Sequence, residues 1–229
     1  RLVHKEYNVA MIYGECSSTA YEMGLIAESR SWDARLLSLL RGRTTPYFYS
    51  LIREELVERS LDLGLPIPDG GGKGRWVRLL KRASGVKELT GDDRALVRKM
   101  LRKGMVGRFP LHIASSLLSL ARHLRRCGAW REHAEILADM VRYAREHSLD
   151  GPSVEIAIES AAGRFTSGKV EDAGQEIRSV LGRTSGRRTA WFAVLLAAAV
   201  DDRLGSLAQA KEGAGRAHAL SEELLRGVE

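Results

Sequence analysis

The chain contains 229 residues, of which 44% are hydrophobic and 28% charged, a balance typical of folded soluble proteins. Its two cysteines, Cys16 and Cys127, supply neither a disulfide framework nor a zinc site, and they favour a reducing compartment. The longest uncharged apolar run, residues 190–200, is shorter than the roughly 20 residues that span a bilayer, so we predict no membrane segment. The formal net charge of +7 suits a polyanionic partner, although arginine used for solubility would give the same balance.

The N-terminal part of the chain predicts helices only. A short helix over residues 3–14 is followed by a hairpin, in which Ser17 or Ser18 caps the first helix and Ser31 caps the second. Residues 46–63 predict a further helix, because a proline stands at its first position and the apolar residues after it recur at helical spacing. No run of alternating β-branched residues predicts a sheet.

The central part of the chain is basic. Residues 75–84 predict a short basic helix. Thr90 caps the next helix, which has Asp92 and Asp93 in its first turn, cations near its end and Gly104 after it, in the order that the helix dipole prefers. Six more helices are predicted over residues 111–126, 130–148, 152–167, 170–182, 187–203 and 206–226.

The helical pattern divides into two predicted lobes. Residues 1–64 form an N-terminal helical lobe, and residues 75–229 form a helical-repeat lobe. Residues 65–74, rich in glycine and proline, are the loop between them. A glycine in this loop is followed by Lys73, but the preceding prolines and the missing Ser/Thr do not fit a phosphate-binding loop.

Four segments share the pattern of a turn followed by an amphipathic helix. They read SRSWDARLLSLL, CGAWREHAEILADM, SGKVEDAGQEIRSV and LGSLAQAKEGAGRA. Each is predicted to place a small residue in the first turn of the second helix, where it lets two helices approach closely: Ala34, Ala134, Ala173 and Ala210. A glycine in the last three turns supplies a positive φ. This period of about 35–40 residues predicts an all-α fold, a right-handed α-solenoid of helix-turn-helix repeats.

The segment SVEIAIESAAGRFTSGKVEDAGQEIRSVL resembles a pentatricopeptide or tetratricopeptide repeat, mainly through its Gly-Lys-Val-Glu-Asp-Ala turn. The pentatricopeptide resemblance implies single-stranded RNA as the partner and a mitochondrion as the location. The tetratricopeptide resemblance implies a protein or peptide partner, and the alternative location is the cytoplasm. By alignment on the turn, the base-reading position falls at Ile158, at Leu195, at Leu118 or Ser119, and at Thr19. Because most of these residues are apolar, a base-reading code is largely absent, and phosphate contact is the expected mode of RNA binding.

The candidate nucleic-acid-binding residues are the cations between residues 73 and 103. They are Lys73, Arg75, Arg78, Lys81, Arg82, Arg94, Arg98, Lys99, Arg102 and Lys103. The same cations would also form a solvated outer face on short helices whose leucines pack inward. Trp32 and Trp130, near the starts of second helices, are predicted to anchor the core between hairpins.

The sequence contains no pattern that indicates catalysis. The histidines are not paired at metal-ligand spacing, and no serine or cysteine stands in a nucleophile motif. We therefore predict no catalytic residue, no metal and no cofactor. The predicted function is a non-catalytic helical-repeat protein associated with RNA or a ribonucleoprotein assembly. The alternative is a tetratricopeptide-like adaptor or regulatory module for a protein or peptide.

Overall fold

The computed structural model describes residues 4–22, 26–41, 54, 56–61, 75–83, 89–103, 110–184 and 187–226. Within these ranges every regular element is a helix and none is a strand, so the all-α prediction is confirmed. The helices are α1 (His4–Glu22), α2 (Ile26–Leu40), α4 (Arg75–Ala83), α5 (Gly91–Lys103), α6 (Pro110–Arg126), α7 (Trp130–Glu146), α8 (Asp150–Thr166), α9 (Val170–Val180), η1 (Leu181–Arg183), α10 (Arg187–Arg203) and α11 (Leu207–Arg226). Residues 56–61 are also helical.

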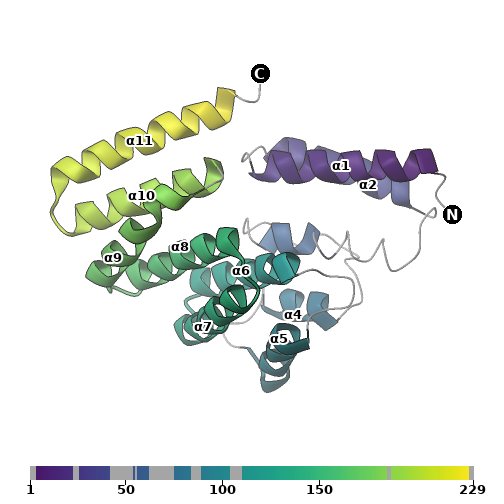
Figure 1. Cartoon of the computed structure of the whole chain (residues 1–229), viewed down its shortest axis with the longest axis horizontal. Coiled ribbons are helices and arrows are strands. Elements are labelled where there is room, and N and C mark those ends of the chain that lie inside the picture. The colour runs from purple at the N-terminus through teal and green to yellow at the C-terminus, as the bar shows by residue number, and fades with distance from the viewer. Residues whose placement is uncertain are drawn as a thin grey trace.

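The helices from α6 to α11 pack as successive hairpins, each against the next along the chain (Figure 1). Their bounds agree with the predicted ones within about two residues, because each helix has a clear apolar stripe and a clear end. Two apolar cores fill the stack. One is shared by residues 56–61, by α4, α5, α6 and α7, and by Ile156 of α8, and the other lies among α8, α9 and α10.

The turns that join these helices repeat one geometry. The turns after α6, α8 and α10 hold Gly128, Gly168 and Gly205 at φ values of 74°, 87° and 78°, as the sequence predicts. The turn after α7 uses Ser148 at a φ of 53°. In the turn after α6 the N–H of Ala129 donates to the carbonyl five residues before it at 2.9 Å, and the other three turns have the equivalent bond. These are Schellman-type ends, which satisfy the last carbonyls of each helix.

The small-residue positions are partly wrong in register. Ala173 and Ala210 are buried at the helix contacts, as predicted. Ala134 is exposed, because the fifth residue after the turn glycine is His133, and that residue is 4% exposed. The facing helix makes room for it with Gly163, where a Cβ atom would lie 2.3 Å from the His133 ring. Ala34 is also exposed, so it does not mark a close helix contact.

The first hairpin consists of α1 and α2, but its helices begin and end elsewhere than predicted. α1 continues without interruption through Gly14, so the predicted helix end at residue 14 and the cap at Ser17 or Ser18 are wrong. Ser31 lies inside α2, so that cap is wrong as well. A glycine inside a helix costs only about 1 kcal/mol relative to alanine. The packing of α1 on α2 around a small apolar core offsets that cost.

The helical residues 56–61 touch helices of both predicted lobes. Two of their side chains belong to the large core that α4 to α7 share. Trp76 on α4 donates its indole N–H to Glu58 at 2.5 Å, and it is the largest fully buried side chain in the described residues. On the opposite side, Arg59 donates to the hydroxyl of Ser18 on α1 at 2.9 Å. Residues 56–61 therefore connect the first hairpin to the central helices.

The helices form an arc in which the start of α10 faces the end of α1 (Figure 1). The guanidinium carbon of Arg188 on α10 lies 4.5 Å from the ring centroid of Tyr21 on α1, a cation–π contact. The predicted loop over residues 65–74 lies outside the described residues. The division into lobes 1–64 and 75–229 stays a prediction.

Candidate functional site

The net positive charge of the chain is concentrated in two short helices. α4 carries four cationic side chains and no acid, and α5 carries five cations and two acids, so together they have the formal charge of +7 that the whole chain has. Each helix buries one apolar stripe: Trp76, Leu79, Leu80 and Ala83 on α4, and Val97 and Met100 on α5. Because residues three and four apart share a face, this packing leaves cations on the outer faces, where five are exposed: Arg78, Arg82, Arg98, Lys99 and Arg102.

The structure separates the ten predicted phosphate-contacting residues into three groups. Arg78, Arg98, Lys99 and Arg102 are exposed on α4 and α5. Arg82 and Arg94 form ion pairs with Asp93 and Glu132, both of which are buried. Arg75, Lys81 and Lys103 lie on the same two helices, but their side chains, like Lys73 as a whole, lie outside what the structure describes.

The start of α5 is held by the cap that the sequence predicts. The hydroxyl oxygen of Thr90 accepts the N–H of Asp93 at 3.2 Å, and the Asp93 carboxylate accepts the Thr90 N–H at 3.1 Å. Burial opposes ionisation of Asp93. The hydrogen bonds from Thr90 and the neighbouring charge of Arg82 outweigh it and hold the pKa of Asp93 below its ordinary value. This reciprocal pair fixes the position of the basic helix.

A cleft of about 270 Å³ lies between α5 and α7. Arg94 and Arg98 line its α5 side, and the carboxylates of Glu132, Glu135 and Asp139 line its α7 side. Arg94 donates through Nη2 to Glu132 at 2.7 Å, whereas its buried Nε has no hydrogen-bond partner in the described part of the chain. The cleft therefore has walls of opposite charge, unlike the outer faces of α4 and α5.

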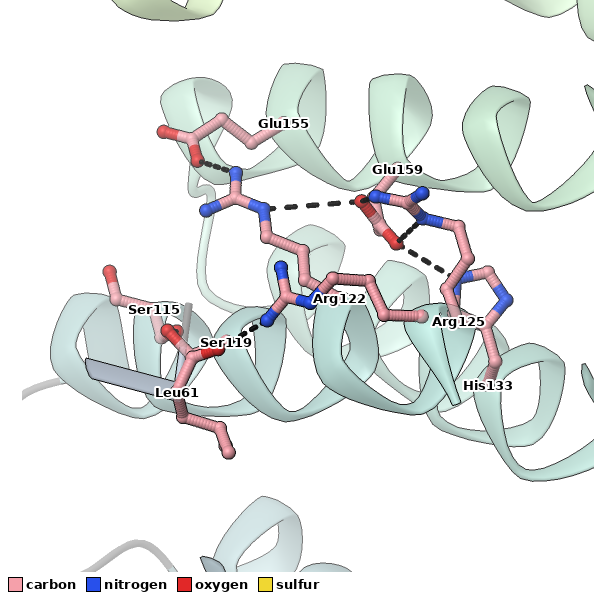
Figure 2. Close-up of polar contacts among 9 residues, drawn as sticks. Leu61, Ser115, Ser119, Arg122, Arg125, His133, Glu155 and Glu159 are labelled. Carbon is pink, nitrogen blue, oxygen red and sulfur yellow. Dashed lines mark hydrogen bonds and ion pairs between the residues drawn. The ribbon is translucent and has the colours of Figure 1, made fainter. Parts of the chain in front are cut away.

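A second charged cluster joins α6, α7 and α8 (Figure 2). Glu159 on α8 is 1% exposed and accepts a hydrogen bond from Arg125 Nε at 2.6 Å. His133 Nε2, which carries a proton when it bonds a carboxylate, lies 3.1 Å from the same oxygen. Arg122 Nε lies 4.0 Å from the other oxygen, and Arg122 also donates to Glu155 at 2.9 Å.

These partners keep the buried carboxylate ionised. Burial opposes the charged form of Glu159, but the hydrogen bond from His133 and the charge and hydrogen bond of Arg125, together with Arg122, hold its pKa below the ordinary value. Because Glu159 is buried, a substrate cannot come within hydrogen-bond distance of its carboxylate, as a general acid or base requires. Glu159 serves to connect three helices.

Sequence reasoning missed this cluster, although one signal was present. Glu159 stands three residues after Ile156 and four before Gly163, both of them buried, so it occupies an apolar stripe. A charged residue in that position requires partners from other helices. The identity of these partners depends on how α6 and α7 pack on α8. No local pattern in the sequence indicates that packing.

A second buried polar group lies in the first hairpin. Ser17 is 1% exposed and donates to Asp33 at 2.5 Å, and Arg59 donates to Asp33 at 3.2 Å. Ser29 lies within 3.2 Å of Ser17. Although serine and aspartate are common in catalytic sites, this group is saturated and buried, and it fastens residues 56–61 to α1 and α2.

The base-reading positions are mostly unsuited to contact with a base. Leu118 and Ile158 are 4% and 2% exposed and lie in the apolar cores. Leu195 is 39% exposed but apolar. Trp130 is also 39% exposed, so its predicted role as a core anchor is wrong.

The comparisons with known proteins identify no family. No protein-family model matches the chain, and neither the curated proteins nor the solved structures gave a match. Among the described residues, no group of three or more His, Cys, Asp and Glu side chains is placed to hold a metal ion. None of the described helices has both the length and the apolarity that crossing a bilayer requires.

Proposed function

We propose that this chain is a non-catalytic helical-repeat protein that binds RNA through phosphate contacts, as part of a ribonucleoprotein assembly. The observation that carries the proposal is the charge distribution. The formal charge of α4 and α5 together equals that of the whole chain, while the other residues balance, and Arg78, Arg98, Lys99 and Arg102 are exposed there without an ion pair in the described residues. Arginine used for solubility would be spread over the surface, whereas a phosphate-binding surface requires a concentrated basic patch.

The right-handed α-solenoid of helix-turn-helix repeats, related to the pentatricopeptide repeat, is part of the same proposal. The recurring Schellman-type turns and the buried Ala173 and Ala210 support it. Because Leu118 and Ile158 are buried and cannot read a base, the RNA binding in this proposal tolerates any base, since phosphate contacts carry no base information. The pentatricopeptide resemblance is the reason for proposing a mitochondrial location.

The alternative function is a tetratricopeptide-like adaptor that holds a protein or peptide. The apolar residues at the base-reading positions favour it, because an RNA reader places polar side chains there. The two functions make opposite predictions for RNA affinity, so one titration separates them.

The experiment is a fluorescence titration of labelled single-stranded RNA at several salt concentrations. The variant changes Arg78, Lys99 and Arg102, all exposed on α4 and α5, to glutamate. The matched control changes Arg183, Lys211 and Arg216, which are exposed elsewhere, and so alters the net charge by the same amount. Loss of three phosphate contacts should lower the slope of log affinity against log salt by about 2 for a single strand.

We expect the natural chain to bind homopolymeric uridine and adenosine strands with similar, salt-dependent affinity. The α4/α5 variant should bind at least about tenfold more weakly at low salt, and the control should lose much less. If both triple variants weaken binding equally, overall charge and not this surface is responsible. Absence of binding by the natural chain at low salt would remove the RNA function and favour the adaptor.

A further inference from the structure

The cleft between α5 and α7 differs from the basic faces beside it, and its chemistry points to another ligand. Leu89, Val97 and Ile136 contribute apolar surface, and arginines and carboxylates face one another above them. Its volume of about 270 Å³ is just below the roughly 300 Å³ at which sites for drug-sized ligands begin. A group the size of one side chain therefore fits it.

The hydrogen-bonding groups of the cleft call for an acceptor. Each carboxylate already binds an arginine: Glu132 binds Arg94, Glu135 binds Arg131, and Asp139 binds Arg142. The donors are less completely used. Arg94 Nε is buried with no partner in the described residues, and Arg98 is exposed with no ion pair among them. A carboxylate entering the cleft would accept from Arg98 and lie next to the positive charge of Arg94.

A nucleic-acid backbone is a poor match for the same cleft. A strand that placed one phosphate on Arg98 would bring its neighbouring phosphates towards Glu135 and Asp139, and like charges at close range repel. A peptide carries single carboxylates next to apolar side chains and avoids this repulsion. Apolar surface also continues along α7, where Ala138 lines the cleft and Val141, one turn further, is 46% exposed.

We propose that this cleft binds a short peptide segment of a partner protein, with an apolar side chain against Val97 and Ile136 and an adjacent carboxylate on Arg98, next to the charge of Arg94. This site lies beside the phosphate-binding surface and shares Arg98 with its candidate residues, but none of the three residues changed to test that surface, Arg78, Lys99 and Arg102, lines the cleft. Charge complementarity selects the occupant, because the unused groups in the cleft are donors and the acceptors are already paired.

The test uses acetyl-Phe-Glu-amide as the probe. Its binding is measured from the changes in the amide chemical shifts of the ¹⁵N-labelled full-length chain. Acetyl-Phe-Gln-amide, acetyl-Phe-Lys-amide and adenosine 5′-monophosphate are the comparison ligands. We expect saturable shifts at Val97, Ile136 and Ala138 with the glutamate probe. The glutamine probe should bind about tenfold more weakly, as is typical when a charged hydrogen-bond partner is lost.

Two variants locate the binding. Ala138→Trp fills the cleft and should abolish the shifts, whereas Ala134→Trp, also exposed and one turn earlier on α7, should leave them unchanged. Arg98→Gln keeps the cleft open and should weaken the glutamate probe about tenfold while leaving the glutamine probe almost unaffected. Helical circular dichroism checks that each variant is folded.

The opposite outcomes overturn the proposal. Equal affinity for the three dipeptides, or equal effects of the two tryptophan variants, would show that the cleft is not a carboxylate-selective site. If adenosine 5′-monophosphate gave saturable shifts at the same amides and acetyl-Phe-Glu-amide gave none, the cleft would be assigned to nucleotides. Ala138→Trp should keep full RNA affinity, so failure of the peptide site and failure of the RNA surface give different results.

Discussion

Replacement of Glu159 by glutamine tests the charged cluster between α6 and α8. Glutamine keeps the size of the side chain and removes the charge that Arg125, His133 and Arg122 face. Removal of one partner from a buried ion pair costs about 3–5 kcal/mol, because the remaining charge stays buried without compensation. Arg125 and Arg122 are 16% and 22% exposed, so water reaches them in part. We therefore expect the lower end of that range, about 3 kcal/mol.

The matched control is Glu155→Gln, the same chemical change one turn earlier on α8. Glu155 is 33% exposed and its partner Arg122 is 22% exposed, and pairs of this kind contribute at most about 1 kcal/mol. Urea unfolding followed by circular dichroism measures both free energies of unfolding. A loss of 3 kcal/mol corresponds to a decrease of roughly 6–12 °C in the unfolding temperature of a chain this size. The reasoning is wrong if Glu159→Gln costs no more than Glu155→Gln.

The pH dependence of this difference provides a second check. The folded-state pKa of Glu159 is lower than the ordinary value of 4.5, so its contribution to stability is complete above pH 4.5. That contribution is lost as the pH falls through the folded-state pKa, because the protonated carboxyl no longer attracts the arginines. The stability difference between the natural chain and Glu159→Gln should therefore shrink below pH 4.5. A difference that is constant or increases towards low pH contradicts the assignment.

Two further substitutions test the packing and the cap. Gly163→Ala should cost about 1–3 kcal/mol, because the added Cβ lies 2.3 Å from the His133 ring, and His133→Ala should remove most of that penalty in a double-mutant cycle measured by urea unfolding. If the losses in free energy of unfolding from Gly163→Ala and His133→Ala simply added, the contact between the two residues would be contradicted. Thr90→Ala should cost about 1–2 kcal/mol, because it removes the cap of α5 and a donor to Asp93, while Thr90→Ser, which keeps the hydroxyl, should cost much less.

The local signals of the sequence were sufficient for the helices from α4 onward that the structure describes. Thr90 and Asp93 lie three residues apart and form a cap from their own segment, and Gly128, Gly168 and Gly205 take the positive φ that side chains disfavour. The concentration of charge on α4 and α5 is likewise a property of the sequence, and periodicity predicts that it faces outward. These features depend on neighbours within one or two helical turns.

Tertiary packing decided the remaining features. α1 passes through Gly14 because contact with α2 offsets a small local penalty, and no local pattern records that contact. His133 takes the place expected for an alanine because Gly163 faces it. Glu159 is ionised in the interior because two arginines of α6 and a hydrogen bond from His133 of α7 reach it. The sequence alone determined the described helices from α4 onward and where the basic charge lies. Only the packing of one helix on another decided which polar side chains meet, because those pairs are separated along the chain and joined in space.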